Sequence, residues 1–310
     1  RCLATLADTG SVNVVRFAPA TSRIGSLIAT GSDSRLVCIY ELRPGPGRAI
    51  FGVTDKPNVE NWTQVKQMHG HTNDITDLAW SPDGRNLASA SLDNLVIVWD
   101  VLSGQRVVTI DQHNGFVKGV AWDPFNQYLA TQGEQDGVYI WRVGEWEQPV
   151  GHCSDHIGSA HAVSLFARLA WSPDGQTLVS TNGYNEPKHI AAFIKRHTWA
   201  NELSLVGHAS PVVVANFCPK FLKPRKSQNT DELTTALVLG SSDRKFTVWV
   251  RGEKVPLVSG THFFSASITD VAWMPDGSGF FVCSYDGTIA CMRFDPGELG
   301  HFAEQPMVDA

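Results

Sequence analysis

The sequence predicts an all-β fold built from one repeated unit, and three observations lead to this prediction. Short apolar strands recur along the 310 residues, in six copies. Within a copy the first and last aromatic residues keep a fixed distance, since Trp80 and Trp99 are 19 positions apart and so are Trp122 and Trp141. Turn sequences such as Ser-Pro-Asp-Gly separate the strands. A repeat of about 40 residues whose strands cannot bury their apolar faces alone predicts the blades of a β-propeller. The copies begin at Val14, Ile75, Val117, Arg168, Val213 and Ile268.

The clearest copy is ITDLAWSPDGRNLASASLDNLVIVWD at residues 75–100. Apolar side chains recur along its strands, which favours a sheet packed on both faces. The chain is expected to reverse at Ser81-Pro82-Asp83-Gly84, because proline presets one backbone dihedral and glycine accepts a positive φ. The same turn recurs at residues 172–175 and, without the serine, at 275–277. The recurring tryptophans are therefore predicted to pack in the core.

A fourth strand at the sheet edge is expected after five of the copies, at residues 62–68, 106–110, 146–150, 199–206 and 254–259. The last copy, residues 268–294, has no such strand after it, and residues 2–6 are predicted to be an edge strand with no copy before it. Pairing of these two segments would close a six-bladed ring and remove two exposed sheet edges. A seven-bladed ring with a gap is the alternative.

Length and charge suit a single repeat domain. Because a repeat fold grows by adding blades to one ring, residues 1–300 are assigned to the propeller and 301–310 to a C-terminal tail. The 25 basic and 31 acidic residues give a net charge of −6. Nucleic-acid affinity comes largely from phosphate neutralisation, so we expect weak or no direct binding of DNA.

The cysteine pattern indicates a reducing compartment. The six cysteines include no CxxC pair and lack the spacing of a disulfide framework, and several fall in apolar strands. No run of about 18 apolar residues is present, and the first residues lack the character of a signal peptide. We therefore expect an intracellular protein without membrane association. Because the first residue is Arg, we also expect a piece of a longer protein.

Polar residues recur at fixed positions inside the apolar copies. A histidine stands nine residues before the first aromatic residue in three copies, and an aspartate stands six residues before the terminal position in three. One copy carries a complete set. We interpret this set as a buried hydrogen-bonded network that stiffens a blade, and not as a catalytic triad. Its members are His71, Ser89, Asp93 and Trp99.

The fifth copy is longer than the others. The segment from Phe217 to Trp249 is 13 residues longer than in the standard blade. The inserted sequence is polar and contains a basic cluster. This cluster is a candidate partner-binding or nuclear localisation loop, and a solvated loop is the default interpretation. It consists of Lys220, Lys223, Arg225 and Lys226.

One further segment concentrates side chains that bind metals. It lies between the third and fourth copies, matches no standard zinc spacing and is predicted to be an exposed loop, so no metal site is assigned. Its members are His152, Cys153, Asp155, His156 and His161. The sequence also has no P-loop, no G-x-G-x-x-G, no G-x-S-x-G and no His-Glu-x-x-His. We expect no catalytic residue, no cofactor and no enzymatic activity.

The less generic segments resemble one family over nearly the whole chain. They are VNVVRFAP at residues 12–19, NVENW at 58–62, SLDNLVIVW at 91–99, FVKGVAWDP at 116–124, LVGH followed by NFCPKF at 205–221, GSSDRKFTVW at 240–249, VCSYDGT at 282–288 and FDPGELG at 294–300. Together they resemble the N-terminal WD-repeat propeller of the HIRA/Hir family. That propeller has seven blades, and the resemblance implies a first repeat ahead of Arg1 that this sequence does not contain.

The resemblance implies a function as well as a fold. It implies a non-enzymatic nuclear scaffold of a histone chaperone complex, one that assembles nucleosomes independently of replication and represses transcription. The implied protein partners are a ubinuclein/Hpc-type subunit and, within the complex, the histone three/four dimer.

Two other functions remain open. The WD subunit of the replication-coupled chromatin assembly factor shares VNVVRF, ENW and the Trp-Asp-Pro copy, whereas IKRHTW at residues 194–199 and VCSYDGT are more similar to the HIRA side. A generic WD-repeat adaptor, such as a substrate receptor of a ubiquitin ligase, is the second alternative. Only the shared fold argues for that adaptor.

Overall fold

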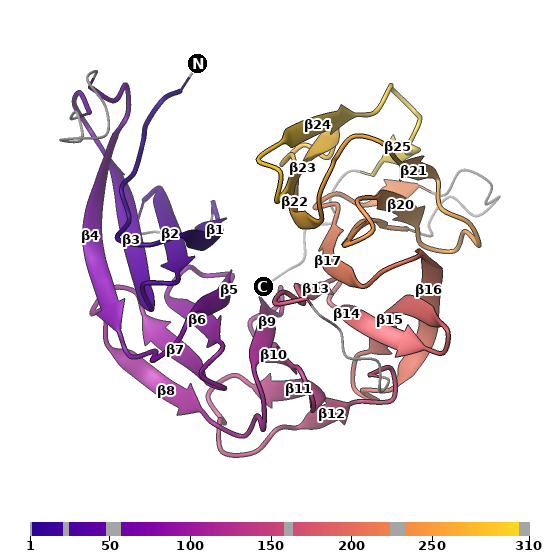
Figure 1. The fold of residues 1–310 in the computed structure, drawn as a ribbon, viewed down its shortest axis with the longest axis horizontal. Coiled ribbons are helices and arrows are strands. Elements are labelled where there is room, and N and C mark those ends of the chain that lie inside the picture. Colours follow the sequence, from indigo (N-terminus) through magenta and orange to yellow (C-terminus); the bar gives the residue numbers. More distant parts are fainter. Residues whose placement is uncertain (1, 21–24, 48–56, 158–163, 224–232, 304–310) are drawn as a thin grey trace. The chain divides into compact units, whose positions relative to one another are not determined.

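The computed structural model describes residues 2–20, 25–47, 57–157, 164–223 and 233–303 (Figure 1). All regular secondary structure within these ranges is β-strand, which confirms the all-β prediction. The chain divides into two compact units, Arg1–Val150 and Gly151–Ala310. No helix in the described ranges is long and apolar enough to cross a membrane.

The first unit contains three antiparallel sheets, which we call blades one to three. Blade one orders β1 (Val12–Phe17), β2 (Leu27–Ser32), β3 (Leu36–Arg43) and β4 (Asn61–His69). Blade two orders β5 (Ile75–Trp80), β6 (Asn86–Ser91), β7 (Val96–Asp100) and β8 (Arg106–Ile110). Blade three contributes β9 (Val117–Trp122), β10 (Tyr128–Gly133) and β11 (Gly137–Arg142) to this unit. Each sheet is a meander, in which strands consecutive in the sequence are neighbours in the sheet.

The second unit begins with the short strand β12 (Gly151–Cys153). Blade four orders β13 (Ala170–Trp171), β14 (Thr177–Asn185), β15 (Lys188–Lys195) and β16 (Asn201–His208). Blade five orders β17 (Val212–Phe217), β19 (Ala236–Ser241), β20 (Phe246–Val250) and β21 (Val258–Gly260). Blade six has three strands, β22 (Ile268–Trp273), β23 (Gly279–Ser284) and β24 (Ile289–Arg293). The six predicted copies therefore correspond to six blades.

Apolar side chains fill the space between neighbouring blades of one unit. Ile39 of blade one shares a buried cluster with Leu78 and Trp99 of blade two. The indole Nε1 of Trp80 donates to the carbonyl of Arg16 at 3.0 Å, which adds a polar link between the same two blades. A blade is thus stabilised chiefly by its neighbours, as the repeat predicts.

The predicted turns have the expected chemistry. In the Ser-Pro-Asp-Gly turn of blade two, Ser81 donates its hydroxyl proton to Asp83 at 2.6 Å, and the backbone N–H of Arg85 donates to the same carboxylate oxygen at 3.0 Å. Gly84 has a φ of 71°. This left-handed conformation favours glycine and lets β6 return beside β5.

Two of the five predicted edge strands are displaced. Residues 146–150 form no strand, and β12 follows them at Gly151–Cys153. Residues 254–257 are also irregular, and β21 covers only Val258–Gly260. Both predicted segments contain a proline, Pro149 and Pro256, which has no N–H to donate to a neighbouring strand. The other three edge strands are β4, β8 and β16, at the predicted places.

The prediction of a strand at residues 2–6 is wrong, because this segment has no strand conformation. Its backbone bonds instead go to the start of the NVENW segment. The N–H groups of Val59 and Glu60 donate to the carbonyl of Leu3 at 2.7 and 3.1 Å. The Asn58 side chain also bonds Thr5, accepting from its N–H at 2.9 Å and donating to its carbonyl at 3.0 Å.

Blade six differs from the other blades in how much of its apolar face is covered within its unit. Ile289 stands three residues before the terminal position of its copy and is 70% exposed. The residues at the same position in blades two and five, Val96 and Phe246, are 0% and 2% exposed. Blade six therefore presents an apolar face and the edge of β24 that have no partner in the described part of its own unit.

The insertion in blade five is anchored by a strand pair. Its first part forms β18 (Leu222–Lys223), which pairs with β25 (His301–Phe302), and the Ala303 N–H donates to the carbonyl of Phe221 at 2.9 Å. Leu222 is fully buried. Two residues of the predicted tail thus belong to a sheet, and residues 304–310 lie outside the described ranges.

Candidate functional site

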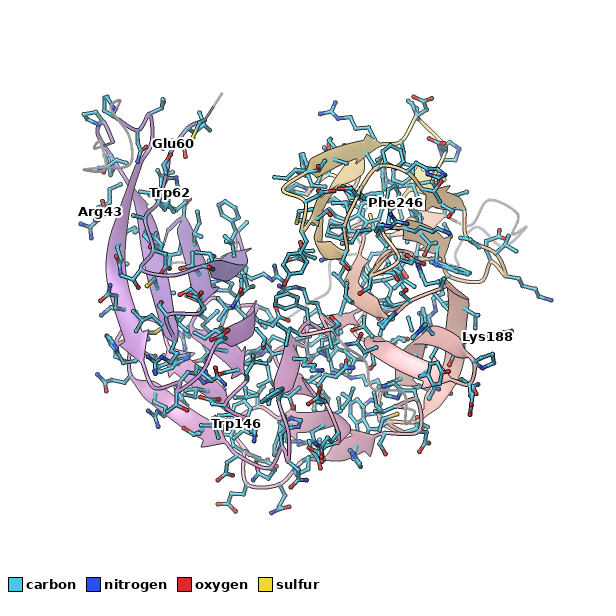
Figure 2. The ribbon with its side chains drawn as sticks, in the orientation of Figure 1. Arg43, Glu60, Trp62, Trp146, Lys188 and Phe246 are labelled. Atoms are coloured by element: carbon cyan, nitrogen blue, oxygen red, sulfur yellow. The ribbon has the colours of Figure 1, made fainter. Side chains whose placement is uncertain are left out.

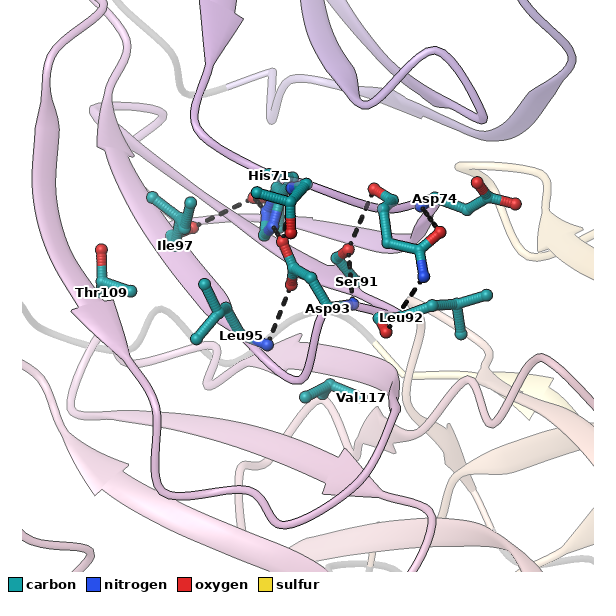
Figure 3. Close-up of polar contacts among 12 residues, drawn as sticks. His71, Asp74, Ser91, Leu92, Asp93, Leu95, Ile97, Thr109 and Val117 are labelled. Atoms are coloured by element: carbon teal, nitrogen blue, oxygen red, sulfur yellow. Dashed lines mark hydrogen bonds and ion pairs between the residues drawn. The ribbon is translucent and has the colours of Figure 1, made fainter.

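The polar set of blade two is one connected chain of hydrogen bonds. Figure 3 shows two of its members, His71 and Asp93, with the bond from Leu95 to Asp93. His71 Nδ1 lies 2.9 Å from Asp93 Oδ2, and His71 Nε2 lies 2.7 Å from the hydroxyl of Ser89. The Trp99 indole donates to the same hydroxyl at 2.9 Å. Asp93 also accepts from the backbone N–H groups of Thr72 and Leu95, at 2.8 and 3.0 Å. The turn before β7 is thereby tied to the segment before β5.

The protonation of this chain follows from the carboxylate. Burial raises the pKa of Asp93, but the bond from His71 and the two backbone donors lower it by more, so that its pKa lies below the usual 3.8. Because Asp93 is ionised, it accepts a hydrogen bond from His71 Nδ1. The Ser89 hydroxyl also donates to the carbonyl of Ile97 at 3.3 Å. Ser89 has no exposed surface, so its hydroxyl cannot reach a substrate. The arrangement thus links two segments of the blade through side chains, and its serine hydroxyl is buried.

Two further blades contain a similar network with threonine in place of serine, and the aspartate is within hydrogen-bond distance of the histidine in blade five but slightly farther away in blade three. In blade three, His113 Nε2 lies 2.8 Å from the hydroxyl of Thr131, which accepts from the Trp141 indole at 3.0 Å. In blade five, His208 Nε2 lies 3.0 Å from Thr247, which accepts from Trp249 at 2.9 Å. Asp136 and Asp243 face the Nδ1 atoms of these histidines at 3.5 and 3.1 Å. The prediction of a single complete set was therefore too narrow.

The first and last blades replace the histidine. Asp8 stands nine residues before Phe17 and accepts from the hydroxyls of Thr30 and Ser32, both at 3.2 Å. In blade six the corresponding residue is Phe264, which is 6% exposed and packs in an apolar cluster. One structural position thus holds an aspartate in blade one, a histidine in blades two, three and five, and a phenylalanine in blade six.

The expectation of an exposed loop is wrong for part of the segment at 152–161. His156 is 1% exposed, its Nε2 lies 2.6 Å from the hydroxyl of Ser180, and its Nδ1 lies 3.6 Å from the Sγ of Cys153. Burial lowers the pKa of His156 to about 4, although Asp155 opposes the shift. Burial also raises the pKa of the Cys153 thiol. No group of three possible metal ligands occurs in the described ranges, and His161 lies outside them.

A cleft of about 430 Å³ opens in the first unit between residues 5–7 and strands β3 and β4. Arg43 and Trp62 line it. The Trp62 indole donates to the Glu60 carboxylate at 2.7 Å, and its ring meets Phe17 edge to face at 6.1 Å. These three residues, Arg43, Glu60 and Trp62, lie near one end of blade one (Figure 2).

Comparison with known proteins connects this architecture with one family. The family described as "CAF1B/HIR1 beta-propeller domain" matches residues 2–147, and "WD domain, G-beta repeat" matches residues 256–291. Protein HIR1 of Cryptococcus neoformans var. neoformans serotype D is 37% identical over 297 residues, which are 96% of this chain and 33% of that protein. Protein hir1 of Schizosaccharomyces pombe is 36% identical over 304 residues, with 96% and 31% covered. The chain belongs to the HIRA/Hir family.

A third relative, Protein HIR1 of Mycosarcoma maydis, is 36% identical over 300 residues, which are 96% of this chain and 28% of that protein. The Hir-family chain described here spans about a third of the length of the curated relatives it matches. It is a WD-repeat propeller region with the character of a scaffold.

The NVENW segment of this Hir-family propeller has a structural role that sequence reasoning missed. Asn58 holds Thr5 through both of its amide atoms, and the Trp62 ring meets the exposed Phe17 ring edge to face. The segment therefore fixes the residues before β1 against blade one. Its spacing gave no sign of this role, because the contact joins parts of the chain that are 53 residues apart.

The basic cluster of the Hir-family insertion is described only in part. Lys223 is exposed, and its backbone lies in β18 opposite His301. Lys220 is half-buried, while Arg225 and Lys226 lie outside the described residues. The role of this cluster stays a prediction.

Proposed function

We propose that this chain is a nuclear protein-docking scaffold of a HIRA-type histone chaperone complex, which assembles nucleosomes independently of replication and represses transcription. The likeness to proteins named HIR1 over 96% of the chain carries the proposal, together with the blade architecture. Residues 1–300 are the proposed docking region. Packed blades suit this role because they hold surface turns in fixed positions.

The scaffold is proposed to be non-enzymatic and to need no cofactor or metal. The buried networks support this view, because their histidines are engaged by serine, threonine and aspartate partners inside the blades. Among the described residues, the Ser-His-Asp set of blade two has no exposed hydroxyl. These groups stabilise the fold and leave binding to the turns.

The proposed partners are a ubinuclein/Hpc-type subunit and, within the complex, the histone three/four dimer. The net charge of −6 supports protein partners over free DNA, because a surface with an acidic excess gains little from phosphate contacts. The clustered cations at 220–226 are few by comparison.

The WD subunit of the replication-coupled chromatin assembly factor is a second candidate. The description of the family that matches residues 2–147 names both CAF1B and HIR1, so this match alone does not separate the two. The relatives named HIR1, at 32% to 37% identity, favour the first candidate.

Affinity purification of the tagged chain from nuclear extract tests the proposal. Recovery of a ubinuclein/Hpc-type subunit with histones is the expected result. Recovery of the large subunit of the chromatin assembly factor would support the second candidate. Ubiquitin-ligase subunits without histones would indicate a generic adaptor and contradict both.

A further inference from the structure

The second unit contains an open groove of about 520 Å³, distinct from the cleft beside Trp62. This volume lies within the range of about 300–1,000 Å³ that is usual for ligand sites. Phe166, Val213 and Ile268 line it and are at most 8% exposed, so they form its apolar base. Leu165 and Tyr285 also line it but are 46% and 64% exposed, which places them at its rim.

The fold does not require an aromatic side chain at Tyr285. Its backbone N–H donates to the carbonyl of Ser267 at 3.0 Å, a bond that any residue but proline could make. The same turn position holds Leu92 in blade two and Ser242 in blade five. The Tyr285 ring lies 6.5 Å from that of Phe166 and keeps most of its surface in water. Exposed tyrosines of this kind are enriched at protein interfaces.

Two hydroxyl groups of the groove are available to a ligand. Ser210 and Ser242 line it, and neither hydroxyl has a hydrogen-bond partner among the described residues. The hydroxyls of Ser164 and Ser267, in contrast, donate to carbonyl oxygens of the protein. A serine hydroxyl both donates and accepts, so the two available groups suit the N–H and C=O groups of an extended peptide.

The charge of the groove decides the chemistry of its occupant. Its lining contains no Asp, Glu, Lys or Arg, and burial lowers the pKa of His189, the one titratable side chain besides Tyr285. Behind the base, the Arg168 guanidinium lies over the Phe166 ring at 4.7 Å and donates to the carbonyl of Thr269 at 3.1 Å. An ionised side chain entering the groove would lose its water without gaining a counter-charge. The groove therefore complements an uncharged side chain.

The groove is fixed by backbone hydrogen bonds between blades. The Arg168 N–H donates to Val213, and the Ala215 N–H donates back to Arg168, both at 2.9 Å. Within blade five, the N–H of Ser242 donates to the carbonyl of Pro211 at 3.0 Å. A site that is already ordered loses little entropy when a flexible segment binds.

We propose that this groove binds an extended peptide segment of a partner protein, and that one uncharged apolar or aromatic side chain of the segment anchors on Phe166, Ile268 and Tyr285. The inference rests on the proposed function, because the ubinuclein/Hpc-type subunit is the expected source of the segment.

Two probes test the inference with the same set of variants. The first is a phage-displayed library of random peptides selected on the whole chain, and the second is the recombinant Hpc-type subunit. Tyr285→Ala removes the rim aromatic group, and Ser242→Asp places a charge in the neutral groove. Val255→Ser is the matched control, because Val255 is 67% exposed in the same unit and does not line the groove. Urea unfolding of each variant verifies that it is folded.

Selected peptides should share a large uncharged side chain and bind Tyr285→Ala about 30-fold more weakly than the wild type, the loss typical of an interface hot spot. Ser242→Asp should weaken binding by about tenfold or more, and Val255→Ser by less than about twofold. Failure to enrich any peptide, or peptides that bind the two groove variants as tightly as the wild type, would overturn the inference.

The second probe separates the groove from the proposed function. If the Hpc-type subunit binds the wild type and both groove variants equally, the groove inference is overturned while the proposed function stands. If the subunit does not bind the wild type but groove-dependent peptides do, the inference is supported and the proposed function fails.

Discussion

Ile75 occupies the space that a side chain on Gly31 would need. A β-carbon built on Gly31 would lie 2.5 Å from Cγ2 of Ile75, where Gly31 belongs to β2 of blade one and Ile75 begins β5 of blade two. Gly240 and Ile268 repeat the relationship between blades five and six at 2.6 Å. Glycine at this position sets how closely two neighbouring blades of one unit approach.

Gly31→Ala is therefore expected to destabilise the first unit by about 1–3 kcal/mol, the usual cost of overpacking a core. The free energy of unfolding in urea measures the effect. Gly115→Ala is the control, because its new β-carbon would meet only the flexible side chain of Gln135 at 3.4 Å. Equal stabilities of the two variants would show that the blades can separate without cost.

Removal of one hydroxyl group from a blade network is expected to lower the free energy of unfolding, even when the side chain keeps its size. Thr131→Val keeps the shape of the side chain but leaves the Trp141 indole and His113 Nε2 without their shared partner, at a cost of about 1–3 kcal/mol. Thr131→Ser keeps the hydroxyl and should cost less than about 1.5 kcal/mol. Urea unfolding ranks the variants, and the reverse order would refute a polar role for Thr131.

The stability of the protein should fall as the pH falls from about 6.5 toward 4 because of His156. Its folded pKa of about 4 lies below the ordinary 6.5, so the unfolded state binds the proton more readily in this window. Above pH 6.5 the neutral His156 has no destabilising effect. By pH 5, proton binding to the unfolded state should lower the free energy of unfolding by about 2 kcal/mol. Urea unfolding at pH 7 and pH 5 should show a smaller loss for His156→Asn. His189, whose pKa is also lowered, is present in both proteins and contributes equally to the pH dependence of their stability.

The exposed face of blade six should tolerate polar substitution. Ile289→Ser is expected to change the free energy of unfolding in urea by less than about 0.5 kcal/mol. Val96→Ser, at the corresponding buried position of blade two, should cost about 2–5 kcal/mol. A large loss of stability in Ile289→Ser would mean that this face is covered in solution.

The six free cysteines should react at two different rates with an aromatic disulfide reagent at pH 8. Cys2 and Cys291 are exposed and should react quickly. Burial raises the pKa of Cys38 and of Cys218 to about 11, so these thiols should react only after unfolding. Each of Cys2→Ser and Cys291→Ser should remove one rapid equivalent. Cys283 is half-buried and Cys153 is buried, so more than three rapid equivalents in the wild type would contradict the described burial.

The inner strands could be predicted from the sequence because their apolar pattern and aromatic spacing repeat. Edge strands carry a weaker pattern, and Pro149 and Pro256 move two of them along the chain. The network of blade three could have been predicted from the sequence, because Thr131 stands ten residues before Trp141 and Ser89 stands ten residues before Trp99. That of blade five could not, because Thr247 lies on the same strand as Trp249.

The groove of the second unit could not have been predicted from local motifs. Its residues come from separate strands and turns of blades four, five and six, and Ser210, Ser242 and Tyr285 look like ordinary turn residues in the sequence. Only the three-dimensional arrangement reveals that they surround a neutral, apolar base.

The pairing of β18 with β25 constrains how this insertion can evolve. Insertions on a repeat fold are usually free to change in length, because only local backbone depends on them. In blade five, a deletion that removed Leu222 would leave Phe302 without its strand partner. Mutations in the two segments should therefore be selected together, and length differences among relatives should gather after Lys223 and before Thr234.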